Sequence, residues 1–147
     1  MTKAAEKIKV LYLCTGNSCR SQMAEAWTRV LKADRVDAYS AGVDPHAVDP
    51  RAVKAMAEVG IDISGQTSKD VDTLEDIEFE YVITLCDQAH QGCPIFPAKT
   101  RVLHVGFDDP PPLAAGAQTE EKAMVHYRRV RDEIKAFVEK LPEVLGE

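Results

Sequence analysis

The sequence predicts an α/β fold in which a parallel sheet is flanked by helices on both faces. Short apolar runs, typical of buried strands, alternate along the chain with segments whose apolar residues recur at helical spacing. The chain has 147 residues, which suits a single domain spanning 1–147. Apolar residues make up 45% of it, so a core can form without metals or structural disulfides.

The amino-terminal half is predicted to hold two strands, at 9–14 and 36–42, each followed by a helix. The first helix is expected to begin at Ser21. Asp49-Pro50 suits the start of the second, because aspartate caps a helix and proline fits its first turn. Gly60 is a plausible end for that helix. The expected apolar faces consist of Met23, Trp27, Val30 and Leu31 in the first helix, and of Val53, Met56 and Val59 in the second.

The carboxy-terminal half is predicted to add two more strands, at 81–85 and 100–105. The acidic stretch 61–79 reads as loop with a short helix. The proline run within 106–112 is expected to exclude helix, so this stretch should be loop. A long helix is expected over 119–141. Its predicted buried face consists of Met124, Tyr127, Val130, Ile134, Phe137 and Leu141.

Composition excludes several classes of function. The net charge of -6 argues against a nucleic-acid-binding protein, which usually carries a basic excess. No apolar stretch approaches a membrane span, and the first ten residues lack a signal-peptide pattern. We therefore expect a cytoplasmic protein without membrane contact, and we assume a monomer. In that compartment, four cysteines are more often catalytic or redox-active than structural.

The residues with the strongest chemistry follow the ends of different predicted strands. Cys14 ends the first strand, Cys86 follows the third, and Asp109 comes shortly after the fourth. The carboxyl ends of parallel strands meet at one edge of a sheet, which is where such folds bind ligands. These three side chains could therefore converge on one site.

The loop from Cys14 to Ser21 has the properties of an oxyanion site. It joins a strand to a helix, so its backbone N–H groups and the helix end can face an anion. Arg20 supplies a planar fork that suits two oxygens of a phosphate-like ion. Cys14 would then be a nucleophile whose pKa is lowered by this setting. The residues expected to bind the oxyanion are Thr15, Gly16, Asn17, Ser18, Cys19, Arg20 and Ser21. The alternative, a buried thiol and a surface arginine, leaves the complete motif and its position unexplained.

Cys86 and Cys93 are seven residues apart. On a helix their Cα atoms would be about 10.5 Å apart, whereas a disulfide needs less than about 7 Å. They can pair only if the intervening segment gives way, and its polar residues bury little. Two structural thiols remain an alternative. A zinc site would need shorter ligand spacing, so we expect no metal, and nothing in the sequence indicates a cofactor.

The string CTGNSCRSQMAEAW (14–27) resembles the anion loop of the low-molecular-weight tyrosine phosphatase superfamily, and in particular its thioredoxin-coupled arsenate reductases. Five further segments match that family in order. They are YSAG (39–42), AVKAMAEVGIDIS (52–64), VITLCDQAHQGCP (82–94), VGFDDP (105–110) and RVRDEIK (129–135).

The resemblance implies a three-layer fold with a four-stranded parallel sheet in the order 2-1-3-4. It also implies reduction of arsenate to arsenite, as part of arsenic detoxification, by a relay of three cysteines. Cys14 attacks arsenate, Cys86 attacks Cys14, and Cys93 then forms a Cys86–Cys93 disulfide that thioredoxin reduces.

The resemblance further implies a general acid directly before a proline, which here is Asp109, with Asp108 as the alternative. A solvated acidic turn would also fit these residues. Other residues match positions that brace the loop in relatives: Asn17, Glu25, Ser40 and Ser68. Lys69 stands where some relatives carry an aspartate beside a potassium ion, so we expect its ammonium to replace that cation.

Two other functions remain open at this stage. A phosphatase would share the loop and Asp109, but the usual aromatic pair after Pro110 is replaced by Pro111 and Pro112. Weak hydrolysis of phosphate esters is still expected. A sensor could bind arsenate or phosphate and signal through the Cys86–Cys93 pair without turnover. The histidines, at positions 46, 90, 104 and 126, show no ligand spacing and are expected to be structural or superficial.

Overall fold

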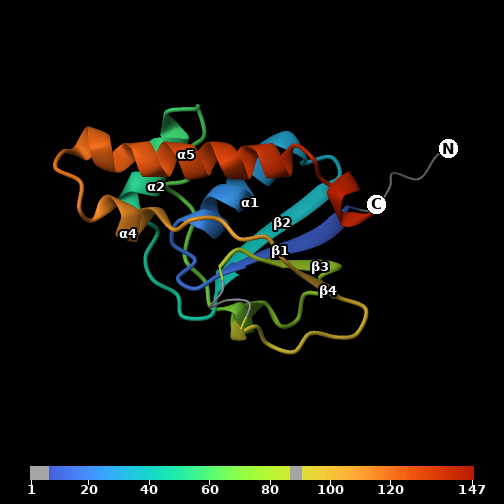
Figure 1. Cartoon of the computed structure of the whole chain (residues 1–147). Coiled ribbons are helices and arrows are strands. Elements are labelled where there is room, and N and C mark those ends of the chain that lie inside the picture. Colours follow the sequence, from blue (N-terminus) through green and yellow to red (C-terminus); the bar gives the residue numbers. More distant parts are fainter. Residues whose placement is uncertain (1–6, 87–90) are drawn as a thin grey trace.

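The computed structural model describes residues 7–86 and 91–147 and forms one sheet with helices packed against it (Figure 1). The strands are β1 (Ile8–Cys14), β2 (Val36–Gly42), β3 (Tyr81–Thr84) and β4 (Arg101–His104). All neighbouring strands are parallel and their order is β2-β1-β3-β4. The predicted fold class and strand order are therefore confirmed.

The described helices are α1 (Arg20–Leu31), α2 (Pro50–Ala57), α4 (Pro110–Ala114) and α5 (Glu120–Val138), with short 3-10 turns η1 (Val71–Leu74) and η2 (Glu143–Leu145). Helices α1, α2, α4 and α5 lie on the same side of the sheet (Figure 1). No helix among the described residues is long and apolar enough to cross a membrane.

Alternation along β1 divides the core between the two faces of the sheet. Val10 and Tyr12 belong to a buried cluster shared with α1, α2 and α5. Leu11 and Leu13 belong to a second cluster, on the other face, that includes Val71 of η1. Successive side chains of a strand point to opposite faces, and a buried cluster covers each face here. Every residue from Val10 to Leu13 is therefore fully buried.

The register of the sheet aligns the carboxyl ends of the strands. Cys14 pairs with Gly42, Leu13 with Thr84, and Thr84 with His104. The loops that follow these strands therefore emerge at one edge, where the sequence placed the site.

Local sequence signals explain most of the element boundaries. The Asp49 carboxylate accepts a hydrogen bond from the Arg51 N–H at the start of α2, as its predicted cap should. Gly60 has a φ of 82°, a left-handed conformation that suits glycine after a helix. The last helix ends at Val138, three residues before the predicted end, although Leu141 is still fully buried.

Two sequence predictions are wrong. The proline run is not loop throughout, because Pro110 begins α4. The first turn of a helix makes no use of its own N–H groups, so prolines are tolerated there. Val30 and Val59 were assigned to buried faces but are 57% and 39% exposed. Val30 lies in the last turn of α1, where the helix leaves the core, and Val59 lies beyond the end of α2.

Candidate active site

The loop between β1 and α1 is held from outside by a backbone strap, residues 43–49. Four N–H groups of this strap donate to four successive or nearly successive carbonyls of the loop. The pairs are Val43 to Cys14 (3.2 Å), Asp44 to Thr15 (2.9 Å), His46 to Gly16 (2.8 Å) and Asp49 to Ser18 (2.9 Å).

This arrangement determines where the loop N–H groups point. In a trans peptide unit the C=O and the following N–H lie in one plane and point in opposite directions. Because the strap holds the carbonyls on the outside, the amides of the same peptide units face the opposite side. Several convergent N–H groups beside a helix N-terminus suit an anion, which is the ligand that the sequence motif predicts for this loop.

Asn17 is the residue at which the loop turns most sharply. Its φ of 48° is a left-handed conformation, and it is the one non-glycine residue with positive φ in the described chain. Its carbonyl accepts hydrogen bonds from Ser68 Oγ (2.7 Å) and Gln22 Nε2 (2.8 Å). Its side chain accepts from the Lys69 N–H (2.8 Å) and donates to Ser21 Oγ (2.8 Å). Asn17 is therefore fixed from both sides.

Glu25, Ser40 and the Lys69 ammonium make their contacts outside the loop itself. Ser40 Oγ donates to the buried Glu25 carboxylate (2.5 Å), which also pairs with Arg29 at 2.9 Å. The Lys69 ammonium donates to the Thr67 carbonyl at 2.8 Å, so its charge is directed at a backbone oxygen.

A cavity of about 280 Å³ opens above the loop. The side of Arg20 that carries Nη1 and Nη2 is anchored to the loop before α4, through the Phe107 carbonyl (2.9 Å) and Asp109 (3.4 Å). Arg20 Nε is buried and, within the described part of the chain, has no hydrogen-bond partner. An anion would satisfy it. The cavity is lined by Cys14, Thr15, Gly16, Ser18, Cys19, Arg20, His46, Asp109 and Pro111.

Cys14 lines this cavity, and Cys86 lies beside it and lines a neighbouring hollow that Arg20 and Asp109 also line. Their Sγ atoms are 3.9 Å apart, and Cys14 is oriented to donate its S–H to Cys86. Thr15 Oγ1 lies 3.1 Å from Cys86 Sγ. The hydrogen bond to Cys86 and burial raise the pKa of Cys14, while the charge of Arg20 and the Thr15 N–H act in the opposite direction. The expected lowering of this pKa is thus reversed while Cys14 contacts Cys86.

The remaining cysteines differ in exposure. Cys93 is half-buried and packs against the margin of the cluster that contains Cys14 and Cys86. Cys19 is buried at the start of α1, and burial is the main reason that its pKa is raised. The segment between Cys86 and Cys93, including Asp87, Gln88 and His90, lies partly outside the described residues.

The two candidate acids have different partners. Asp109 lines the cavity, and its pKa is raised by burial and by the nearby Cys86 and Asp49, against the opposing charge of Arg20. Asp108 instead pairs with Arg129 of α5 at 2.9 Å. The geometry thus favours Asp109 as the proton donor, with Asp108 anchoring the loop.

Sequence reasoning missed several contributors. The strap acts through its backbone, which has no side-chain signature. Gln22 joins the carbonyls of Asn17 and Thr67, and Gln66 donates to Gln22 Oε1 at 2.6 Å. His46 was expected to be structural or superficial; its side chain is 66% exposed, yet its ring lies against Gly16 and lines the cavity. Its position four residues after the YSAG segment was the one available signal.

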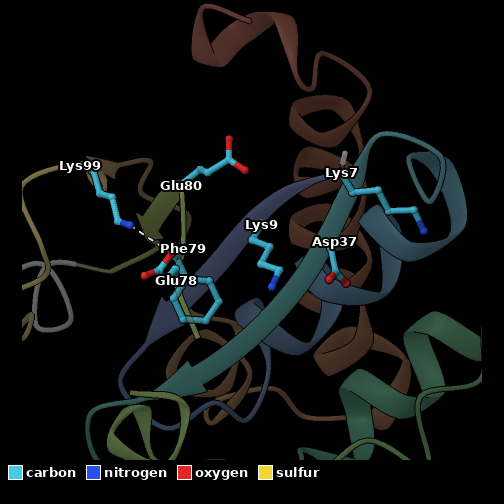
Figure 2. Close-up of a pocket in the computed structure, with 7 residues that line it drawn as sticks. All are labelled: Lys7, Lys9, Asp37, Glu78, Phe79, Glu80 and Lys99. Atoms are coloured by element: carbon cyan, nitrogen blue, oxygen red, sulfur yellow. Dashed lines mark ion pairs between the residues drawn. The ribbon is translucent and has the colours of Figure 1, made fainter. Parts of the chain in front are cut away.

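A larger hollow, of about 640 Å³, lies elsewhere (Figure 2). It is formed at the amino-terminal ends of the strands, the opposite edge of the sheet from Cys14. It holds lysines and carboxylates, among them a Lys99–Glu78 ion pair at 3.0 Å, but no thiol. Across the described residues, no cluster of histidine, cysteine or carboxylate side chains could hold a metal ion.

Comparison with known proteins places this geometry in a family. Residues 9–147 match the low molecular weight phosphotyrosine protein phosphatases. The chain belongs to that family. It is 50% identical over 136 residues to an arsenate reductase of Halalkalibacterium halodurans. The aligned region covers 89% of this chain and 96% of that protein.

Solved structures of the family agree with the fold. An arsenate reductase in its phosphate binding state is 34% identical with a TM-score of 0.71, covering 91% of this chain and 95% of the other. An arsenate reductase in an oxidized state is also 34% identical, with a TM-score of 0.74 and coverage of 90% and 95%. Members of this phosphatase family thus include proteins named for arsenate reduction.

Gly42 should be indispensable to the loop. A Cβ there would lie 2.6 Å from the Thr15 carbonyl oxygen and 2.9 Å from the Asn17 nitrogen, both rigid backbone atoms. Since overpacking costs about 1–3 kcal/mol, we expect Gly42→Ala to weaken binding of inorganic phosphate about tenfold or more, as measured by calorimetry. Gly65→Ala is the control, because nothing lies within 4 Å of its Cβ. Equal phosphate affinity in the Gly42 variant and the wild type would contradict this account.

Removing Cys86 should lower the pKa of Cys14, because the hydrogen bond to Cys86 is the largest cause of its elevation. We expect alkylation of Cys14 in Cys86→Ala to reach half its maximal rate at lower pH than in the wild type. The rate is followed by mass spectrometry of the peptide that contains Cys14. Cys93→Ala, which leaves the contact intact, should behave as the wild type. An unshifted profile in Cys86→Ala would show that burial alone sets this pKa.

Lys69 should make the protein indifferent to potassium. Its ammonium already lies at the Thr67 carbonyl, beside the residues that brace Asn17. We expect the same thermal midpoint in matched sodium and potassium chloride. A midpoint that rises in potassium alone would refute replacement of the cation by Lys69.

Proposed function

We propose that this protein reduces arsenate to arsenite through Cys14, Cys86 and Cys93, and that thioredoxin restores it. The observation that carries the proposal is the 3.9 Å separation between the sulfur of Cys14, which lines the cavity above the loop, and the sulfur of Cys86. A phosphatase needs a nucleophile, an arginine and an acid, but not a second thiol beside the nucleophile. The similarity to proteins named arsenate reductases supports the same activity.

In the first step, the Cys14 thiolate attacks the arsenic(V) centre, and one oxygen leaves as water. The loop amides and Arg20 stabilise the charge on the remaining oxygens. Asp109 protonates the leaving oxygen, and its raised pKa favours the protonated form that this role requires. A Cys14–arsenic bond is formed.

In the second step, the Cys86 thiolate attacks Cys14 Sγ. A Cys14–Cys86 disulfide forms, and the electron pair of the sulfur–arsenic bond passes to arsenic, which leaves as arsenite. Thr15 Oγ1 lies close enough to Cys86 Sγ to hold it during this attack. The thiols have then supplied two electrons to arsenic.

In the third step, the Cys93 thiolate attacks Cys86 Sγ and releases Cys14 as a thiolate. The resulting Cys86–Cys93 disulfide is reduced by the dithiol of thioredoxin through a mixed disulfide. A cytoplasmic protein would meet this reductant in its usual compartment, and a monomer holds every group that the scheme needs.

Pro111 lines the cavity where an aromatic wall would favour aryl phosphates. The site therefore suits a small oxyanion better than a phosphotyrosine peptide, and we expect only weak phosphatase activity. The overall proposal is tested by following NADPH oxidation with thioredoxin and thioredoxin reductase, with and without arsenate. Absence of arsenate-dependent turnover would contradict the proposal and leave a phosphatase or an oxyanion sensor as the remaining functions.

The order of the relay predicts different failures for two cysteine variants. Cys93→Ser should release about one equivalent of arsenite per protein and then stop, because Cys14 stays locked in the Cys14–Cys86 disulfide. Cys86→Ser should release none. Arsenite is counted after rapid mixing with arsenate in the absence of thioredoxin. Repeated turnover by Cys86→Ser in the complete thioredoxin assay would refute the relay.

A further inference from the structure

Tyr127 forms a polar contact that packing alone does not require. Its ring lies in the middle of α5 and is only 1% exposed, so it fills the core as the sequence predicted. Its hydroxyl, however, donates to Asp49 Oδ2 at 2.5 Å. Burial and the neighbouring Asp49 both raise the pKa of Tyr127, so the hydroxyl keeps its proton and acts as donor.

Asp49 connects this hydroxyl to the oxyanion loop. Its second carboxylate oxygen accepts the Arg51 N–H at 2.9 Å, at the start of α2. Its own N–H donates to the Ser18 carbonyl at 2.9 Å and forms the last link of the strap. Three hydrogen bonds meeting at Asp49 thus join Tyr127 of α5, the first turn of α2 and Ser18 in the loop.

The Ser18 carbonyl lies where the loop enters α1. The peptide unit that it shares with Cys19 leads directly into Arg20, the first residue of α1. Cys19 occupies the N-cap of α1 and makes no side-chain capping bond. Serine, threonine, aspartate or asparagine would usually fix this entry, so here the bond from Asp49 holds the peptide unit instead.

We propose that Tyr127 is a positioning residue for oxyanion binding, which acts through Asp49 on the Ser18–Cys19 peptide unit. Its hydroxyl holds the Asp49 carboxylate, and Asp49 in turn keeps that peptide unit turned so that its amide faces the cavity and Arg20 leaves it in the right direction. This inference rests on the proposed function only in requiring that the cavity above Cys14 binds a tetrahedral oxyanion.

The test compares two buried tyrosines that each donate a hydrogen bond but lie at different positions in the fold. Tyr127→Phe removes only the hydroxyl. Tyr81→Phe is the matched control, because Tyr81 is 3% exposed and its hydroxyl donates to the Leu145 carbonyl (3.3 Å) and to Glu147, at the other end of the sheet. Both variants lose a hydroxyl from a buried ring, so a general loss of stability should affect them alike.

Inorganic phosphate is the probe, titrated by calorimetry into the reduced full-length protein. We expect Tyr127→Phe to weaken phosphate binding about three- to tenfold, the range expected for one lost hydrogen bond, and Tyr81→Phe to bind as the wild type does. In the coupled assay, Tyr127→Phe should raise the KM for arsenate by a similar factor with little change in kcat. Hydrogen exchange of the Asp49 amide should be faster in Tyr127→Phe alone.

Two results would overturn the inference. Phosphate affinity in Tyr127→Phe within twofold of the wild type would show that the hydroxyl serves packing only. Equal weakening in both variants would show a general effect of stability. Failure of the proposed function is separate, because a wild type that binds phosphate but does not turn over arsenate still lets the titration decide the role of Tyr127.

Discussion

The site depends on one backbone constraint: the loop after Cys14 must keep its N–H groups inward, so its carbonyls must find donors on the outside. Val43, Asp44, His46 and Asp49 donate through their backbones, while Gln22 and Ser68 serve the carbonyl of Asn17. Each buried carbonyl left unpaired would cost about 1–3 kcal/mol. Even one such carbonyl would take up a sizeable part of the stability of an ordinary domain, about 5–15 kcal/mol. The strap and the sharp turn at Asn17 are therefore conditions for the anion site rather than additions to it.

The contact that the proposed relay needs between Cys14 and Cys86 also holds back the ionisation of Cys14. Cys86 lies 3.9 Å from Cys14, close to where a disulfide would form, but two buried thiols at this distance do not readily give up a proton. A thiol that stays protonated is a poor nucleophile toward peroxides and other chance oxidants. The charge of Arg20 and the loop amides favour the thiolate, so Cys14 is activated when the contact with Cys86 is relaxed. Reactivity is thus coupled to rearrangement of this thiol pair.

The sequence was sufficient for the parts of the fold that depend on side-chain pattern. Short apolar runs, separated by segments with helical spacing, predict β1 to β4. The eight residues from Cys14 to Ser21 predict the anion loop between a strand and a helix. The strap could not be predicted, because any residue type can donate its backbone N–H. Glutamine is usually found at the surface, yet Gln22 is fully buried between two carbonyls. The proline run misled for a related reason: proline is excluded from the interior of a helix but not from its first turn, and α4 is little more than that turn.

The proposed relay asks one small domain to bind an oxyanion and to change the pairing of its cysteines. Different parts of the structure serve these two tasks: a fixed loop binds the anion, and the contacts of Cys86 change. Every donor to the loop carbonyls named above comes from residues 22, 43–49 or 68. Residues on both sides of the stretch between Cys86 and Cys93 are anchored. The Leu85 N–H donates to the Leu13 carbonyl, the Leu85 carbonyl accepts from the Phe107 N–H, and Thr100 Oγ1 donates to the Phe79 carbonyl at 2.6 Å. A change in conformation between the two cysteines would break the contacts of Cys86 with Cys14 and Thr15, but it would leave the strap intact. In the proposed relay, the Cys86–Cys93 disulfide therefore forms while these donors still hold the oxyanion loop, and Cys14 is returned to a cavity that is ready for the next substrate.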